Sequence, residues 1–287
     1  MEQSFLQQLL SDRRELLDLA RSIRSAEQMR EMRREFMESL PEINVTPRTE
    51  EEIRASYLVD SEGTAHIPIT GELTSRAETD ICGAYTAEAL TEYGYIEMAS
   101  LAADEDDRVE RIVYHIDSPG GYADGVMDAA NAMRAVSKPT EARVGAMAAS
   151  AAYWLASQTD RITANSVASR VGSIGVAVEE YDMTQALENA GITRRVYTST
   201  DAPDKRPDTR TEEGQAKIVA QLDDLHRVFA RSVAEGRGTT EDEVNQNYGR
   251  GSILIAERAL AAGMIDEIKT VPARAAQETA ESEPRES

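Results

Sequence analysis

The stretch VERIVYHIDSPGG at residues 109–121 decides the fold. Its first nine residues are rich in β-branched and aromatic side chains, which predicts a buried β-strand over 109–117. The SPGG segment at 118–121 then predicts a turn. Small and apolar side chains follow at helical spacing over 123–136. We therefore expect a strand, a turn and a helix in direct succession.

The chain after about residue 56 repeats this alternation of strands and helices. Repeated strand–helix units imply a mainly parallel sheet covered by helices, so the predicted fold class is α/β. Further strands are predicted at 66–73, 142–147, 161–165, 171–179 and 195–198, and further helices at 150–157, 183–190, 211–235, 241–248 and 256–263.

Both ends of the chain differ from this central part. Residues 1–55 combine dense Arg and Glu with apolar residues at helical spacing, which predicts one or two amphipathic helices. They form either a helical hairpin packed on the main domain or an arm for assembly or docking. Residues 271–287 are polar and acidic, which is typical of a disordered tail. The expected domains are thus a helical arm at 1–55, a main domain at 56–270 and the tail.

The composition excludes several classes of function. Acidic residues outnumber basic ones by 52 to 31, and the resulting net charge of −21 disfavours nucleic acid and anionic membranes as partners. No signal peptide and no apolar run of membrane-spanning length is found, so we expect a soluble, cytoplasmic protein without a membrane partner. A single cysteine, three histidines without ligand spacing, and no GxxxxGK[ST] or HExxH motif lead us to expect no metal and no cofactor.

Two segments that follow strands could build an acyl-transfer site. The glycines of DSPGG at 117–121 let the backbone bend and expose N–H groups that can stabilise an oxyanion, although an ordinary strand-to-helix turn would have the same sequence. The segment GAMAASAAYW at 145–154 places Ser150 where a strand passes into a helix, close to the positive end of the helix dipole. Ser150 is therefore either a nucleophile or a plain N-cap residue.

A serine nucleophile needs a base, and the sequence offers few. His115 lies within a strand and is expected to point into the core, and arginine does not release its proton. A lysine can serve when burial lowers its pKa, and Lys205 lies in an irregular loop after a predicted strand. The alternative is a solvated loop lysine beside Asp204. The segment VGSIGV at 171–176 adds Ser173, whose hydroxyl either points at a catalytic group or marks a β-bulge.

Together these motifs resemble the signal peptide peptidase A family of serine peptidases, within the ClpP/crotonase superfamily. DSPGG, the serine before a Tyr-containing helix, GSIGV, a loop lysine and the closing segment GSILIAERALAAGMIDEI occur in the family's order over about residues 64–270. The resemblance implies a ClpP/crotonase-like spiral of strand–helix units and a peptidase domain at 56–270. It also implies roles for five residues: Ser150 as nucleophile, Lys205 as general base, Ser173 as the group that orients the lysine amine, and the N–H groups of Gly121 and Ala151 as the oxyanion hole.

The same resemblance implies partners and a location. The family assembles into rings in which the serine and lysine of one site come from neighbouring subunits, so we expect a homo-oligomer. We also expect an extended peptide or protein substrate. Relatives without a membrane anchor resemble phage prohead proteases, which degrade scaffold protein and mature capsids, and this implies a place within the prohead in an infected cell. Ala151-Ala152 replaces the family's usual Gly-Gly, and the loop around Lys205 also departs from the family's pattern.

Three other functions stay open at this point. A cytoplasmic protein of the same family would degrade peptides. A ring or scaffold protein of the same fold would be inactive if the altered loop keeps Lys205 away from Ser150. A crotonase-type acyl-CoA enzyme would share the fold and the oxyanion hole but would need no serine nucleophile.

Overall fold

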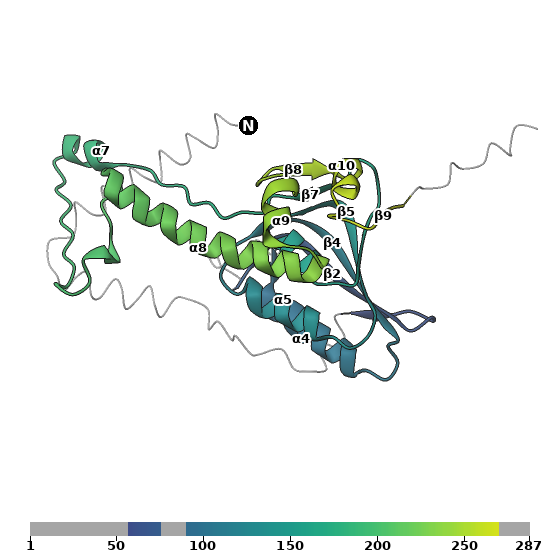
Figure 1. Ribbon diagram of the computed structural model, residues 1–287. Coiled ribbons are helices and arrows are strands. Elements are labelled where there is room, and N and C mark those ends of the chain that lie inside the picture. Colours follow the sequence, from purple (N-terminus) through teal and green to yellow (C-terminus); the bar gives the residue numbers. More distant parts are fainter. Residues whose placement is uncertain (1–56, 76–89, 270–287) are drawn as a thin grey trace, which may run out of the picture. The chain divides into compact units, whose positions relative to one another are not determined.

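The computed structural model describes residues 57–75 and 90–269 of the chain (Figure 1). The predicted helical arm at 1–55 and the predicted tail at 271–287 lie outside the described residues. Both segments, and the domain boundaries that they define, therefore stay predictions.

One sheet runs through the described part of the chain. Its strands are β1 (Leu58–Val59), β2 (Thr64–Thr74), β3 (Leu90–Glu92), β4 (Arg111–Gly121), β5 (Thr140–Ala149), β6 (Arg161–Ala164), β7 (Arg170–Gly172), β8 (Ile253–Ile255) and β9 (Glu267–Ile268). They follow the order β1-β2-β4-β5-β6-β9, with β3 beside β2 and with β7 between β5 and β8. The described strand pairs are parallel except for β1–β2 and β7–β8, which confirms the predicted α/β class with a mainly parallel sheet.

Helices connect most of the parallel strands, as the repeated units predict (Figure 1). Within the described residues, no helix has both the length and the apolar character that crossing a bilayer requires. The helices are α4 (Tyr93–Glu105), α5 (Val126–Ala135), α6 (Ala151–Ala156), α7 (Thr184–Asn189), the short 3₁₀ helix η1 (Pro203–Lys205), α8 (Glu212–Arg237), α9 (Glu241–Asn247) and α10 (Ala256–Ala261).

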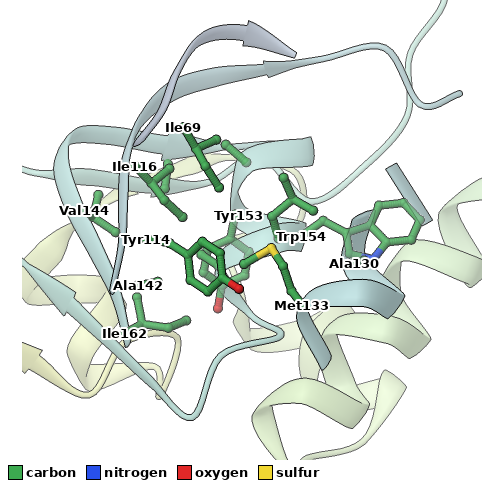
Figure 2. Packing of buried hydrophobic residues seen from close by; sticks show 14 of the residues in the cluster. Ile69, Tyr114, Ile116, Ala130, Met133, Ala142, Val144, Tyr153, Trp154 and Ile162 are labelled. Atoms are coloured by element: carbon green, nitrogen blue, oxygen red, sulfur yellow. The ribbon is translucent and has the colours of Figure 1, made fainter. Parts of the chain in front are cut away.

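The core lies on the sheet face that α4, α5 and α6 cover. Successive side chains of a strand point to opposite faces, and on β4 the fully buried ones on this face are Ile112, Tyr114 and Ile116. Figure 2 shows Tyr114 and Ile116 packed with residues of the helices, among them Met133 and Tyr153. Burying each such apolar side chain contributes about 1.5–3 kcal/mol, so this layer holds the ends of β4 and β5 firmly in place.

Only the C-terminal half of α8 packs into this core. Its buried residues, apart from Gly214, lie between Phe229 and Ala234. Phe229 stacks on Trp154 of α6, with ring centroids 4.4 Å apart, and the Trp154 Nε1–H donates to Ser232 Oγ at 2.8 Å. The N-terminal half of the helix leaves apolar side chains exposed to solvent.

Two of the predicted strands are wrong in whole or in part. The strand predicted at 171–179 ends at Gly172, and the residues 195–198 form no strand. A strand needs a neighbour for its N–H and C=O groups, and no described segment of the chain pairs with residues 173–179 or 195–198. Both of these stretches therefore lie outside the described sheet.

Candidate active site

Ser150 lies between β5 and α6 in a strained backbone conformation. Its φ of 54° and ψ of −126° place it where residues with a Cβ are rarely found, at a cost of about 1–3 kcal/mol. The backbone is held by hydrogen bonds on both sides: the Ser150 N–H donates to Gly172 C=O at 2.7 Å, and the Ser150 C=O accepts from Tyr153 and Trp154 at 2.9 and 3.0 Å. Sharp strand-to-helix turns of this kind expose a nucleophilic hydroxyl.

Ser150 occupies the N-cap position of α6, but its side chain does not cap the helix. An N-cap serine accepts a hydrogen bond from the first turn of its helix. The Ser150 side chain makes no such bond to α6. Its hydroxyl is therefore not used in holding the helix, and it remains available for other chemistry.

The glycine turn of DSPGG touches Ser150 directly. Gly120 has a φ of 98°, and a Cβ built on it would lie 2.6 Å from Ala149 O, 2.7 Å from Ser150 Cβ and 2.9 Å from Ala151 N. These distances are shorter than any stable contact, so only glycine fits there. The fold thus brings the first and second motifs of the sequence into van der Waals contact.

The direction of the N–H groups in this turn follows from the ladder with β2. The Tyr122 N–H donates to Leu73 C=O at 2.9 Å, and the Gly120 N–H donates to Ser118 Oγ at 3.0 Å. Gly121 directly follows Gly120, and a Cβ built on Gly120 would lie 2.9 Å from Ala151 N, so Gly121 and Ala151 lie close to the same contact with Ser150. The Ala151 N–H lies in the first turn of α6, where no preceding carbonyl can accept it. That these two N–H groups form the oxyanion hole stays a prediction.

Ser173 follows the residue that holds Ser150. Gly172 accepts the Ser150 N–H and has a φ of 116°. Ser173 also has a positive φ, 56°, and its N–H donates to Ser252 C=O at 3.1 Å. Two positive φ angles in succession end the strand β7, so Ser173 marks a strand end and not a bulge. The half-buried Ser173 is placed one residue beyond the backbone partner of Ser150.

Lys205 is not brought to Ser150 by the described contacts of one chain. It is the last residue of η1 and is exposed. The neighbouring Asp204 accepts from Lys217 Nζ at 2.7 Å, which ties this loop to the N-terminal half of α8. The residues from Lys217 to Phe229, where α8 meets α6, span about 18 Å at 1.5 Å per residue. In a single chain Lys205 thus matches the alternative of a solvated loop lysine.

Histidine does not replace the lysine at this site. His115 was expected in the core, but it is half-buried on the opposite sheet face from Tyr114, and its Nε2 lies 2.9 Å from His66 Nδ1. Burial, followed by the neighbouring His66 and Arg143, lowers the pKa of the His115 imidazole. Its position three residues before Ser118 puts it about 10 Å back along β4.

A cavity of about 390 Å³ opens beside the segment that follows Ser173. Its walls are residues 174–176, side chains of α8 and α9, and the turn at 250–251. Ser150 and Lys205 do not line it, so the cavity and the strained serine are separate features. In the part of the chain that the structure describes, no group of three or more His, Cys, Asp or Glu side chains is arranged to hold a metal ion.

Sequence reasoning missed three residues that shape this site. Gly120 and Gly172 were noted only as parts of motifs, and their contacts with Ser150 come from strand pairing that the sequence does not display. Ser118 was treated as a turn residue, although its hydroxyl is buried and bonded on both sides. A glycine within a predicted strand was the available signal, since glycine there often marks a close approach of another backbone.

One known family matches more than half of the chain. A sequence model described as peptidase family S49 matches residues 132–283. The matched region contains Ser150, Ser173 and Lys205, whereas Gly121 lies before its first residue.

Relatives of the chain include phage and bacterial proteins. It is similar to the head-tail preconnector protein GP5 of Enterobacteria phage P21, with 29% identity over 210 residues that cover 72% of this chain and 40% of the relative. Capsid assembly protease C of Escherichia phage lambda is 28% identical over 210 residues, which cover 72% and 46%. Protease 4 of Salmonella typhi is 28% identical over 167 residues, which cover 57% and 27%. The chain thus spans less than half the length of each of these relatives.

The comparisons and the structure bear on the family and the fold that the sequence predicts. The predicted resemblance to signal peptide peptidase A is confirmed by the family match and by relatives that are named as proteases. The predicted ClpP-like α/β fold is confirmed by the family and by the mainly parallel sheet. On this evidence the chain belongs to peptidase family S49.

Proposed function

We propose that this protein is a serine endopeptidase in which Ser150 is the nucleophile and Lys205 is the general base. The observation that carries the proposal is the backbone of Ser150, held at a φ of 54° by Gly172 and pressed against the glycine turn. Strain of this kind persists only where the surrounding structure enforces it, and it is found most often at functional sites. A crotonase-type enzyme would have no use for a serine hydroxyl in this position.

The proposed reaction is acyl transfer through the Ser150 hydroxyl. The neutral amine of Lys205 accepts the hydroxyl proton while Oγ forms a bond to the scissile carbonyl carbon. The negative charge that develops on the carbonyl oxygen is stabilised by the N–H groups of Gly121 and Ala151. The protonated lysine then gives its proton to the leaving amine as the peptide bond breaks. Water, deprotonated by the same lysine, releases the acyl group and restores Ser150.

The general base would come from a neighbouring subunit. Within one chain Lys205 is exposed and its loop is tied to the part of α8 that does not pack on the core. The segment around it exposes large apolar side chains that a second copy of the chain would cover: Val178, Tyr181, Met183, Ile192, Val196 and Tyr197. In a ring, this segment would carry Lys205 to the Ser150 of the next subunit, and Ser173 would orient the amine there.

The substrate would be an extended peptide or protein segment. Residues 174–182 follow β7 outside any helix and pair with no strand in the described structure. A substrate strand can pair with such a segment and present its scissile bond to Ser150. The similarity to capsid assembly protease C of phage lambda supports a capsid or scaffold protein as the substrate and the prohead as the location. Degradation of peptides in the cytoplasm is the alternative for the same site.

An inactive ring or scaffold protein is the second candidate function. The observation that favours it is the exposure of Lys205, together with a loop that departs from the family's pattern. Under this function the chain would assemble but Ser150 would not react.

Labelling with a serine-reactive phosphonate tests both candidates. The assembled protein should form an adduct on Ser150, located by mass spectrometry, and labelling should be lost in Ser150→Ala and Lys205→Ala but kept in the control Lys269→Ala. Lys269 is a suitable control because it pairs with Glu141 at 3.5 Å, on β5 and not in the η1 loop. An unlabelled Ser150 in the assembled protein would refute the peptidase and support the scaffold.

Mixing two inactive variants tests the shared site. Ser150→Ala supplies an intact lysine, and Lys205→Ala supplies an intact serine. When the two are dissociated, mixed and reassembled, mixed subunit pairs should regain labelling and peptide hydrolysis, whereas each variant alone stays inactive. Absence of any recovery in properly reassembled mixtures would place both groups in the same chain.

A further inference from the structure

The glycine turn beside Ser150 contains a hydroxyl that the proposed reaction does not use. Ser118 is buried, with only 1% of its surface exposed. Its Oγ donates to Gly71 C=O at 2.6 Å and accepts the Gly120 N–H at 3.0 Å. A single side chain thus binds the backbone of two strands, β2 and β4, directly before the residues that contact Ser150.

These two bonds lie where the sheet is irregular. The register between β2 and β4 shifts between Thr70 and Glu72, and the register between β4 and β5 shifts between Ile116 and Ser118. The next residue, Pro119, has no N–H group to offer the ladder. Because regular pairing is interrupted here, the Ser118 hydroxyl takes part in fixing the turn to β2.

We propose that Ser118 is a positioning residue for the oxyanion hole, an inference that rests on the proposed function. Its hydroxyl holds the Gly120 N–H and is itself bound to Gly71 of β2, and under the proposed function this fixes the orientation of the adjoining Gly121 N–H. Glycine adopts several backbone conformations at little cost, so the Gly120–Gly121 peptide would rotate more freely without this bond. A hydrogen bond weakens steeply as its angle falls, and a misdirected donor stabilises the oxyanion less.

The expected effect is smaller than the loss of a whole donor. Removing one oxyanion-hole donor lowers kcat by about 10²–10³-fold. Ser118→Ala leaves the Gly121 N–H in the chain but less well directed, so kcat should fall by roughly 10–100-fold. KM should stay within about twofold, because the donor acts on the transition state and not on the bound substrate.

A matched control comes from the other side of β2. The Thr91 Oγ1 donates to Thr70 C=O at 2.7 Å and accepts the Thr70 N–H at 3.0 Å, so it bridges the backbone as Ser118 does. Thr91 lies on β3 and does not belong to the turn. Thr91→Val removes the hydroxyl while keeping the side-chain shape, and it should lower stability but leave kcat within about twofold.

The experiment compares the assembled wild type, Ser118→Ala, Ser118→Thr and Thr91→Val. For each we would measure kcat and KM on a peptide substrate, the inhibition constant of a peptide aldehyde, and amide hydrogen exchange at Gly120 and Gly121. Ser118→Ala should weaken the aldehyde, whose serine adduct carries an oxyanion, by the same factor as kcat and should speed exchange at Gly120. Ser118→Thr keeps the hydroxyl and should restore kcat. Should Ser118→Ala fail to fold, Ser118→Cys removes the strong acceptor at nearly constant size.

The results separate this inference from the proposed function. Full activity of Ser118→Ala or Ser118→Cys, unchanged exchange at Gly120, or an equal loss of kcat in Thr91→Val would each refute the role of Ser118 while leaving the peptidase intact. A wild-type protein that neither cleaves peptides nor labels Ser150 would refute the proposed function, and the inference with it.

Discussion

Replacing Gly120 by alanine should destabilise the fold and also abolish the reactivity of Ser150. The added Cβ would lie 2.6 Å from Ala149 O and 2.7 Å from Ser150 Cβ, so the turn and the serine must move apart by several tenths of an ångström or more. Overpacking of this kind costs about 1–3 kcal/mol. The φ of 98° adds about 1–2 kcal/mol for a residue with a Cβ. The free energy of unfolding should therefore fall by roughly 2–5 kcal/mol.

Gly238→Ala is the control that separates the steric part of this effect from the backbone strain. Gly238 has a φ of 63° at the end of α8, and a Cβ there would meet nothing within 4 Å. It should cost only the backbone strain, about 1 kcal/mol, and should leave the labelling of Ser150 unchanged. The assays are urea unfolding and the rate of phosphonate labelling. If Gly120→Ala is no less stable than Gly238→Ala and labels at the wild-type rate, the close contact between the turn and Ser150 is not what the protein forms in solution.

Two further predictions concern the support of the site and its pH dependence. Trp154→Ala should lower the free energy of unfolding by about 3–5 kcal/mol, because it removes the stacking on Phe229 that joins α6 to α8. Trp154→Phe should lower that free energy much less, and urea unfolding of the two variants measures the difference. Burial raises the pKa of Glu141, but the hydrogen bonds from Arg143 and Thr163 outweigh it and lower that pKa to about 2. The stability that comes from this lowered pKa is present above the ordinary value of 4.5 and is lost as the pH falls toward 2. Glu141→Gln should therefore lose about 1–2 kcal/mol less free energy of unfolding than the wild type over that pH window. Equal losses in the wild type and in Glu141→Gln would contradict this prediction.

The spacing of apolar residues along the sequence predicted most of the fold, because the residues of the sheet core follow that spacing. The strand predicted at 109–117 corresponds to β4, which begins at Arg111 and continues to Gly121, so the turn predicted at 118–121 is wrong and the SPGG segment is the end of the strand. The long helix predicted at 211–235 corresponds to α8, which begins after Thr211 and extends to Arg237. The helix α4 was not predicted, because its first turn contains Gly94 and its N-cap Glu92 makes no side-chain cap bond. It is held by burial of Ile96 and its neighbours, which a local pattern does not reveal.

The sequence predicted those parts of the candidate site that are formed by residues close together in the chain. Ser150 was recognised from a strand that passes into a helix, and the glycine turn from two successive glycines, since both signals lie within a few residues. The strain at Ser150 was not predictable, because it depends on Gly172, a residue on another strand. The predicted strand beyond Gly172 failed for a related reason: β-branched residues favour a strand only when a neighbour is available to pair with it.

Ser150 is firmly positioned in one chain and Lys205 is not, because different interactions hold the two residues. Ser150 is fixed by main-chain contacts with Gly120 and Gly172, and the proposed oxyanion donors Gly121 and Ala151 adjoin this contact in the buried core of one chain. Lys205 is held by an exposed ion pair at its neighbour Asp204, and exposed pairs contribute little to stability. Folding of a single chain would therefore complete the nucleophile and the oxyanion hole but not deliver the base. Under the proposed function, assembly and not folding is the step that makes the enzyme active, which would keep a peptidase harmless until its copies are concentrated in one place.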